Sequence, residues 1–264
     1  WWSGLPASFQ CARITLGDLS LSEPVDTPHV AVLWMIFGSL CFGTMNALVK
    51  YTSDLDGVDV WMVILIRSAV IAFAVAGFAV SRGISLKMND PKTMFLRCTV
   101  GLIAMILYFS ALARIPIGQA VTLQYTAPIF VALLSGRIIA EKVQPSVIAL
   151  VVTAFAGIVL IVSPSLGSVE PNALLALGSG LFAALAYIYV RELRKTDSAT
   201  SVVFWFAAFS VAGSLVQAAP HVSNLDTHTL AALIGVGIGA GGGQVGITMA
   251  YHRANAAWVS AFSY

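Results

Sequence analysis

The stretch Ala111–Tyr125 (ALARIPIGQAVTLQY) aligns without a gap on Ala250–Tyr264 (AYHRANAAWVSAFSY) at the end of the chain. A second pair of segments, Phe37–Gly43 (FGSLCFG) and Leu177–Ala183 (LGSGLFA), repeats at the same offset to within one residue. Two independent segments that agree on one offset indicate an internal repeat, which makes the fold a pair of related units.

Composition places the repeat in a membrane. Hydrophobic residues make up 58% of the 264 residues and charged residues 10%, and the mean hydropathy is +0.88. A soluble domain has about 25% charged residues. The chain is therefore predicted to be an all-α polytopic membrane protein. Its net charge of +2 is spread over several connectors, so nucleic acid is not an expected partner, whereas the lipid bilayer is.

A helix that crosses the hydrocarbon core needs about 20 apolar residues. Such stretches are expected near 29–50, 58–80, 94–113, 117–139, 145–164, 172–191, 200–219 and 229–251, with a ninth that begins near 255. Residues 1–28 are polar and mixed, do not fit this pattern, and are interpreted as a disordered segment or a mis-called start.

Lysine and arginine sort the connectors by side. One set of connectors carries most of the basic residues, and the opposite set carries only Lys50 and Arg114. The first set holds Arg82, Lys87, Lys92, Arg97, Arg137, Lys142, Arg191, Arg194, Lys195 and Arg253. Because cytoplasmic loops are enriched in basic residues, the N-terminus and this set are predicted to be cytoplasmic.

The two units are expected to have opposite orientations in the membrane. The first unit, residues 29–164, holds five spans, and an odd number makes the second unit, residues 171–264, enter from the other side. The second unit stops within its fourth span, so about eight and a half spans of a ten-span protein are present, and the gene is expected to continue past Tyr264. Inverted repeats of this kind are typical of transporters that bind substrate between their halves.

One region carries a family resemblance. The segment Ala120–Leu134 (AVTLQYTAPIFVALL), followed by Glu141 and by Gly157–Pro164 (GIVLIVSP), resembles the fourth and fifth spans of an EamA-type member of the drug/metabolite transporter superfamily. Arg67 lies where such transporters often carry an arginine. The resemblance implies a ten-span carrier of the bacterial inner membrane that moves a small metabolite by alternating access and needs no cofactor. A homodimer is left open.

Arg67 is the most informative single residue. It lies about nine residues inside a span of otherwise apolar side chains, and a charge at that depth costs several kcal/mol unless it is paired or hydrated. In one interpretation it faces a central cavity and attracts an anionic group of the substrate. In the other it extends to the outer interface or binds backbone carbonyls and Asp59. The equivalent positions of the second unit are Phe206 and Ala207, so the fold does not require a cation there.

Polar and aromatic residues inside spans form the rest of the candidate site. In hydrocarbon they need hydrogen-bond partners, which either a neighbouring helix or a substrate supplies. The cavity candidates besides Arg67 are Asn46, Tyr108, Gln119, Thr122, Gln124, Tyr125, Tyr187, Trp205 and Gln244. Two further positions are predicted to act structurally or in gating: Pro128, expected to kink its span, and Glu141, expected to form an ion pair at the cytoplasmic interface.

The glycine run Gly235–Gly243 contains a GxGxxG match, which in a soluble domain would suggest a dinucleotide site. Inside an apolar span, close helix packing is the better interpretation, through one face with Gly235, Gly239 and Gly243 and another with Gly237 and Gly241. A structural or gating role is therefore assigned to Gly239 and Gly243.

Two other functions compete with a carrier. A membrane-embedded enzyme is disfavoured because the sequence holds no HExxH, no GxSxG and no cluster of His, Asp and Glu inside a span. A channel is disfavoured by the inverted repeat. Acidic residues are also absent from the middle of the eight complete spans, which favours facilitated diffusion or exchange over a proton relay within them.

The assigned topology can be tested by cysteine labelling. In a variant without Cys11, Cys41 and Cys98, we expect a cysteine at Ser165 to react with a membrane-impermeant maleimide from the periplasm and a cysteine at Ser198 to remain unlabelled. Labelling of Ser198→Cys alone would reverse the orientation.

Overall fold

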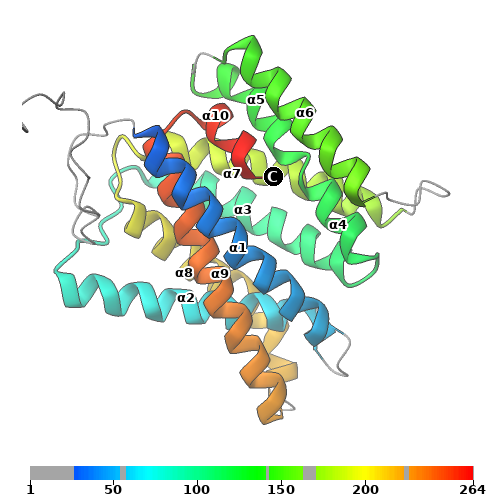
Figure 1. Cartoon of the computed structure of the whole chain (residues 1–264). Coiled ribbons are helices and arrows are strands. Elements are labelled where there is room, and N and C mark those ends of the chain that lie inside the picture. The colour runs from blue at the N-terminus through cyan, green and yellow to red at the C-terminus, as the bar shows by residue number, and fades with distance from the viewer. Residues whose placement is uncertain (1–26, 54–57, 141–142, 163–170, 223–225, 264) are drawn as a thin grey trace, which may run out of the picture.

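The computed structural model describes residues 27–53, 58–140, 143–162, 171–222 and 226–263, and within these ranges the regular structure is helical (Figure 1). The elements are α1 (Pro28–Ser53), α2 (Val60–Arg82), α3 (Pro91–Leu112), α4 (Ile117–Gln124), α5 (Ala127–Ile138), α6 (Pro145–Val162), α7 (Ala173–Leu193), α8 (Ala199–Val222), α9 (Thr227–Arg253), α10 (Ala256–Ser260) and the 3₁₀ turn η2 (Ala261–Ser263). Seven stretches in the described ranges are long and apolar enough to cross a membrane, with α4 and α5 together forming one of them. The prediction of an all-α polytopic membrane protein is confirmed.

The fourth predicted span is broken in the middle. Helix α4 ends at Gln124 and α5 begins at Ala127, so Pro128 falls in the first turn of α5. Proline is tolerated there because the first amides of a helix have no intrahelical acceptor. The kink expected at Pro128 is therefore present, as a break at Tyr125 and Thr126.

Three pairs of long helices form the body of the bundle. Helix α1 packs along α9, α3 along α7 and α2 along α8, while α10 lies against α5 (Figure 1). The repeat offset relates α1, α2 and α3 to α7, α8 and α9. The offset therefore exchanges the α1–α9 pair with the α3–α7 pair, and it maps the α2–α8 pair onto itself. Two halves related by a two-fold axis would produce this pattern.

Glycines bring α9 close to its neighbours. A Cβ added at Gly246 would lie 2.6 Å from the Cα of Gly38 on α1, and one at Gly239 would lie 3.1 Å from the carbonyl oxygen of Cys41. On another face of α9, Gly237 meets Val70 of α2. In a bilayer, small residues let backbones approach and gain dispersion energy that larger side chains would prevent. The two predicted glycine faces thus contact two different helices.

The connector between α2 and α3 is fastened to the turn between α7 and α8. The carboxylate of Asp197, which is 1% exposed, accepts hydrogen bonds from the backbone amides of Asn89 at 2.8 Å and Asp90 at 3.2 Å. Asp90 in turn caps α3 by accepting from the amide of Thr93 at 3.1 Å. Hydrogen bonds from Thr93 hold the pKa of the Asp90 carboxyl below its ordinary value.

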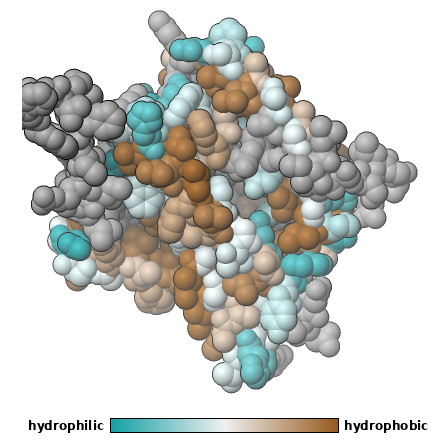
Figure 2. All heavy atoms as spheres, viewed as in Figure 1, coloured by the Kyte–Doolittle hydropathy of each residue, from teal (hydrophilic) through white to brown (hydrophobic). Residues whose placement is uncertain are grey.

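The outer surface of the bundle matches a lipid environment. Figure 2 shows hydrophobic residues along the exposed side of α1 and hydrophilic ones near the ends of the bundle. Leu33, Ile36, Phe37 and Leu40 of α1 and Phe73 of α2 are among the exposed large side chains. Such an apolar surface is unfavourable in water and is expected of helices that face acyl chains.

The close approach of α1 and α9 generates a stability prediction. We expect Gly246→Ala to lower the free energy of unfolding by about 1–3 kcal/mol, because the new methyl group meets the Gly38 backbone and overpacks the interface. Unfolding in mixed micelles with increasing SDS measures the change.

Gly77→Ala is the matched control, since a Cβ at Gly77 in α2 meets no atom within 4 Å. It should leave stability unchanged or raise it by up to about 1 kcal/mol through helix propensity. Equal effects of the two substitutions would show that α1 and α9 are not in backbone contact.

Candidate functional site

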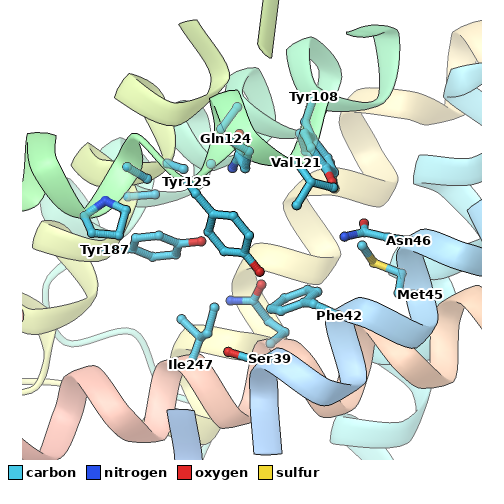
Figure 3. Close-up of a pocket in the computed structure, with 18 of the residues that line it drawn as sticks. Ser39, Phe42, Met45, Asn46, Tyr108, Val121, Gln124, Tyr125, Tyr187 and Ile247 are labelled. Atoms are coloured by element: carbon cyan, nitrogen blue, oxygen red, sulfur yellow. The ribbon is translucent and has the colours of Figure 1, made fainter. Parts of the chain in front are cut away.

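A cavity of about 180 Å³ lies inside the bundle. Residues of α1, α2, α3, α4, α5, α7, α8 and α9 line it, so both proposed halves contribute (Figure 3). The space suits several water molecules or one small organic solute.

Most of the residues predicted from the sequence meet in this cavity. Seven of the ten cavity candidates line it, and so does Pro128. The seven are Arg67, Asn46, Tyr108, Gln124, Tyr125, Tyr187 and Gln244. Six of them come from six different helices and Tyr125 from the break between α4 and α5, and the fold brings them together around one space.

Arg67 lies in the cavity wall and is 4% exposed. Its Nη1 contacts the sulfur of Met105 on α3, and its guanidinium carbon lies 5.7 Å from the centre of the Phe109 ring. Its Nε has no hydrogen-bond partner. The side chain therefore points into the bundle, and the structure does not place it on Asp59 or at the outer interface. That it binds substrate stays a prediction.

Arg97 is the residue that the sequence analysis misplaced. It was assigned to a cytoplasmic connector, but it is part of α3, is 2% exposed and lines the cavity. Its guanidinium carbon lies 4.0 Å from the centre of the Phe206 ring of α8, and its Nε and Nη1 have no hydrogen-bond partner. The error arose because an arginine one or two turns inside a span ordinarily extends its head back to the interface.

Gly101 explains why Arg97 points inward. A Cβ at Gly101 would collide with Nη1 of Arg97 and would lie 2.8 Å from the Phe206 ring. Gly101 follows Arg97 by one turn on the same face of α3, in the direction away from the basic connectors. The missing side chain at Gly101 thus leaves room for the guanidinium on the inner side of Arg97. A glycine four residues after the arginine was the available sequence signal.

Tyrosines and amides form the rest of the polar lining. The rings of Tyr125 and Tyr187 project into the cavity opposite Ser39 and Phe42 of α1 (Figure 3). The Tyr187 ring stacks on Tyr251 of α9, with ring centres 5.0 Å apart and planes 14° from parallel. Tyr251 lies near the end of α9 that adjoins the basic connectors, so this stack borders the cavity on that side. Tyr251 was not predicted, because its position resembles that of an interfacial aromatic residue.

Three amide side chains line the cavity, and one of them has a buried atom without a hydrogen-bond partner. Gln124, at the end of α4, accepts a hydrogen bond from the hydroxyl of Ser179 on α7. Gln244 donates to the Thr248 hydroxyl one turn later at 3.4 Å. Asn46 lies beside Tyr108 (Figure 3), and its carbonyl oxygen is buried without a partner. Such groups can bind a polar solute at little cost in protein hydrogen bonds.

Three predicted cavity residues lie elsewhere. Gln119 does not line the cavity. The Thr122 hydroxyl donates to the carbonyl of Gly118 in its own helix at 2.7 Å. The indole of Trp205 donates to the carbonyl of Leu86 at 2.8 Å, in the connector between α2 and α3. For Thr122 and Trp205, backbone carbonyls satisfy the polar group, so these side chains are structural.

Four positions are predicted to act in structure or gating, and the structure describes three of them. Gly239 and Gly243 face α1, and Pro128 lies at the break beside the cavity. Glu141 lies outside the described residues. A gating role for these residues stays a prediction.

The EamA-like transporter family matches residues 29–163, about half of this membrane-spanning chain. The chain belongs to this family. Curated relatives whose matches cover about nine-tenths of this chain are named as transporters. An uncharacterized transporter of Helicobacter pylori is 29% identical over 88% of this chain and 81% of its own length.

Two other relatives have named substrates. The pseudopaline exporter CntI of Pseudomonas aeruginosa is 27% identical over 91% of this chain and 84% of its own. The riboflavin transporter of Vibrio cholerae is 28% identical over 90% of this chain and 81% of its own. A solved crystal structure with 19% identity superposes with a TM-score of 0.75 over 90% of this chain and 84% of that one, which shows the same fold.

Proposed function

We propose that this EamA-like transporter carries a small organic anion across the bacterial inner membrane by alternating access between two inverted five-helix units. The cavity that holds Arg67 and Arg97 is its substrate site. In this proposal residues 29–164 and 171–264 belong to the two units, and the N-terminal segment and the basic connectors are cytoplasmic.

The observation that carries the proposal is the pair of buried guanidinium groups. Both arginines line one cavity, and each packs against a phenylalanine ring and a helix instead of a carboxylate. A buried charge without a counter-charge is strongly unfavourable in hydrocarbon, and intramembrane charges mark substrate or ion pathways. An anionic substrate would supply the missing charge.

The helix pairs support alternating access. Packing of α1 with α9 and of α3 with α7 joins helices of different halves, and the two pairs exchange under the repeat. A rearrangement that opens one side of the cavity then has a counterpart that opens the other. The break between α4 and α5 borders the cavity and supplies a flexible point in the wall.

The named relatives fit a cavity with both charge and aromatic rings. The Pseudomonas aeruginosa relative is named for pseudopaline and the Vibrio cholerae relative for riboflavin, so proteins of this fold carry small organic molecules. A transport role accounts for the cavity without any catalytic residue, and we assign the chain no enzymatic activity.

Charge-displacement recordings on proteoliposomes adsorbed to a solid support test the proposal. Concentration jumps of succinate, adipate and benzoate should give saturable currents with at least one of these acids, and 1,6-diaminohexane should give none. We expect Arg67→Ala to abolish the currents without reducing membrane insertion, because removing a charge lowers the insertion cost.

Arg114→Ala is the matched control, because Arg114 is an exposed arginine outside the cavity, and it should retain the currents. Currents that rise linearly with concentration would indicate a channel. Wild-type currents in Arg67→Ala, or no saturable response to any of the acids, would overturn the anion-carrier proposal.

A further inference from the structure

The two arginines contact different residues of one helix, α3. A Cβ at Gly101 would collide with Nη1 of Arg97, whereas Arg67 contacts Met105 and lies near Phe109. The side chains of Met105 and Phe109 lean back along α3 toward Gly101, and the two guanidinium charges are close enough to repel each other.

One carboxylate carries a single negative charge, so it balances only one of the two guanidinium groups even where its two oxygens bridge both. None of the described residues that line the cavity is acidic. A monoanion would therefore leave one buried positive charge unbalanced.

The contacts of each guanidinium leave it able to bind a carboxylate. The Phe206 ring covers the face of Arg97, and a stacked guanidinium still directs its N–H groups outward in its own plane. Arg67 packs near Phe109 in a looser arrangement and keeps Nε without a partner. Each arginine can therefore donate hydrogen bonds to one acid group.

The cavity wall beside the two arginines is suited to a carbon spacer. On α3 it includes Gly101, Ala104 and Met105, which offer no side-chain hydrogen-bond donor. Tyr125, at the break between α4 and α5, and Tyr187 of α7 also face the cavity (Figure 3), and their rings can pack on an apolar or planar segment.

From this geometry we infer that the substrate is an organic dianion, with two acid groups joined by a mainly carbon spacer, held by Arg67 at one end and Arg97 at the other. The inference rests on the proposed function and specifies its substrate class. It also gives a reason for two arginines in one cavity, since only a dianion brings the charge of the loaded site to zero with one molecule.

Binding to the purified 264-residue protein in nanodiscs tests the inference by isothermal titration calorimetry. The probes are the α,ω-dicarboxylates from succinate to sebacate, each beside its monomethyl ester, which has the same backbone and one charge fewer. We expect affinity to peak at one chain length and the diacid of that length to bind at least about tenfold more tightly than its monoester, as a second charge-assisted hydrogen bond provides.

Substitutions assign the two ends. Arg67→Gln and Arg97→Gln should each reduce the diacid-to-monoester ratio to about one, whereas Arg114→Gln, which changes an exposed arginine, should keep it. If either cavity variant fails to fold, the chain-length profile and the ratio of the wild-type protein still decide the question.

Three results would overturn the inference. Equal affinity for diacid and monoester at every length would leave a single-anion carrier, so the proposed function would stand without the dianion. Binding of two monoesters per protein would show that two separate anions fill the site. Absence of binding by any diacid or monoester would remove the proposed function as well.

Discussion

The fold must accommodate two guanidinium groups, those of Arg67 and Arg97, buried within a helical bundle. A cation deep in a membrane costs several kcal/mol even by lenient scales. Arg67 and Arg97 are 4% and 2% exposed. Among the described residues, the rings of Phe109 and Phe206 lie near the two guanidinium groups, and no acidic side chain lines the cavity.

Helix α3 is the element that organises this site. It carries Arg97 and Gly101, which fix the inward direction of one guanidinium, and Met105 and Phe109, which contact the other. Its pairing with α7 brings Tyr187 to the cavity. Glycines on α9 allow close backbone contact with α1, which also lines the cavity. These tightly packed contacts make that part of the cavity wall rigid.

The sequence predicted the spans well because the hydrophobic length of each helix is a local property. Seven of the ten cavity candidates also line the cavity, since a polar residue deep in a span must face either a partner helix or a cavity. That they bind substrate stays a prediction. Trp205 could not be resolved in the same way, because its acceptor, the Leu86 carbonyl, is brought to it only by the fold. Thr122 donates to the Gly118 carbonyl of its own helix, a local bond that any threonine inside a helix can form. Arg97 was misplaced for a further reason: its position near a helix end is compatible with two opposite directions, and the neighbouring Gly101 and Phe206 select between them.

The predicted inverted repeat is consistent with the helix packing. The observed pairs α1 with α9, α3 with α7 and α2 with α8 have the symmetry that such a repeat would produce. The two repeats differ in sequence at the cavity. Phe206 occupies the position equivalent to Arg67, and the Arg97 guanidinium lies over its ring. In the proposed division into two units, one unit would supply both cations and the other a ring that lies over one of them.

The most direct test of the account is a crystal structure of the protein with 2-bromoadipate, in which anomalous scattering locates the bromine. The account predicts bromine density inside the cavity, with the two carboxylates on Arg67 and Arg97. Ordered bromine only on the outer surface, with the cavity arginines unchanged, would contradict it.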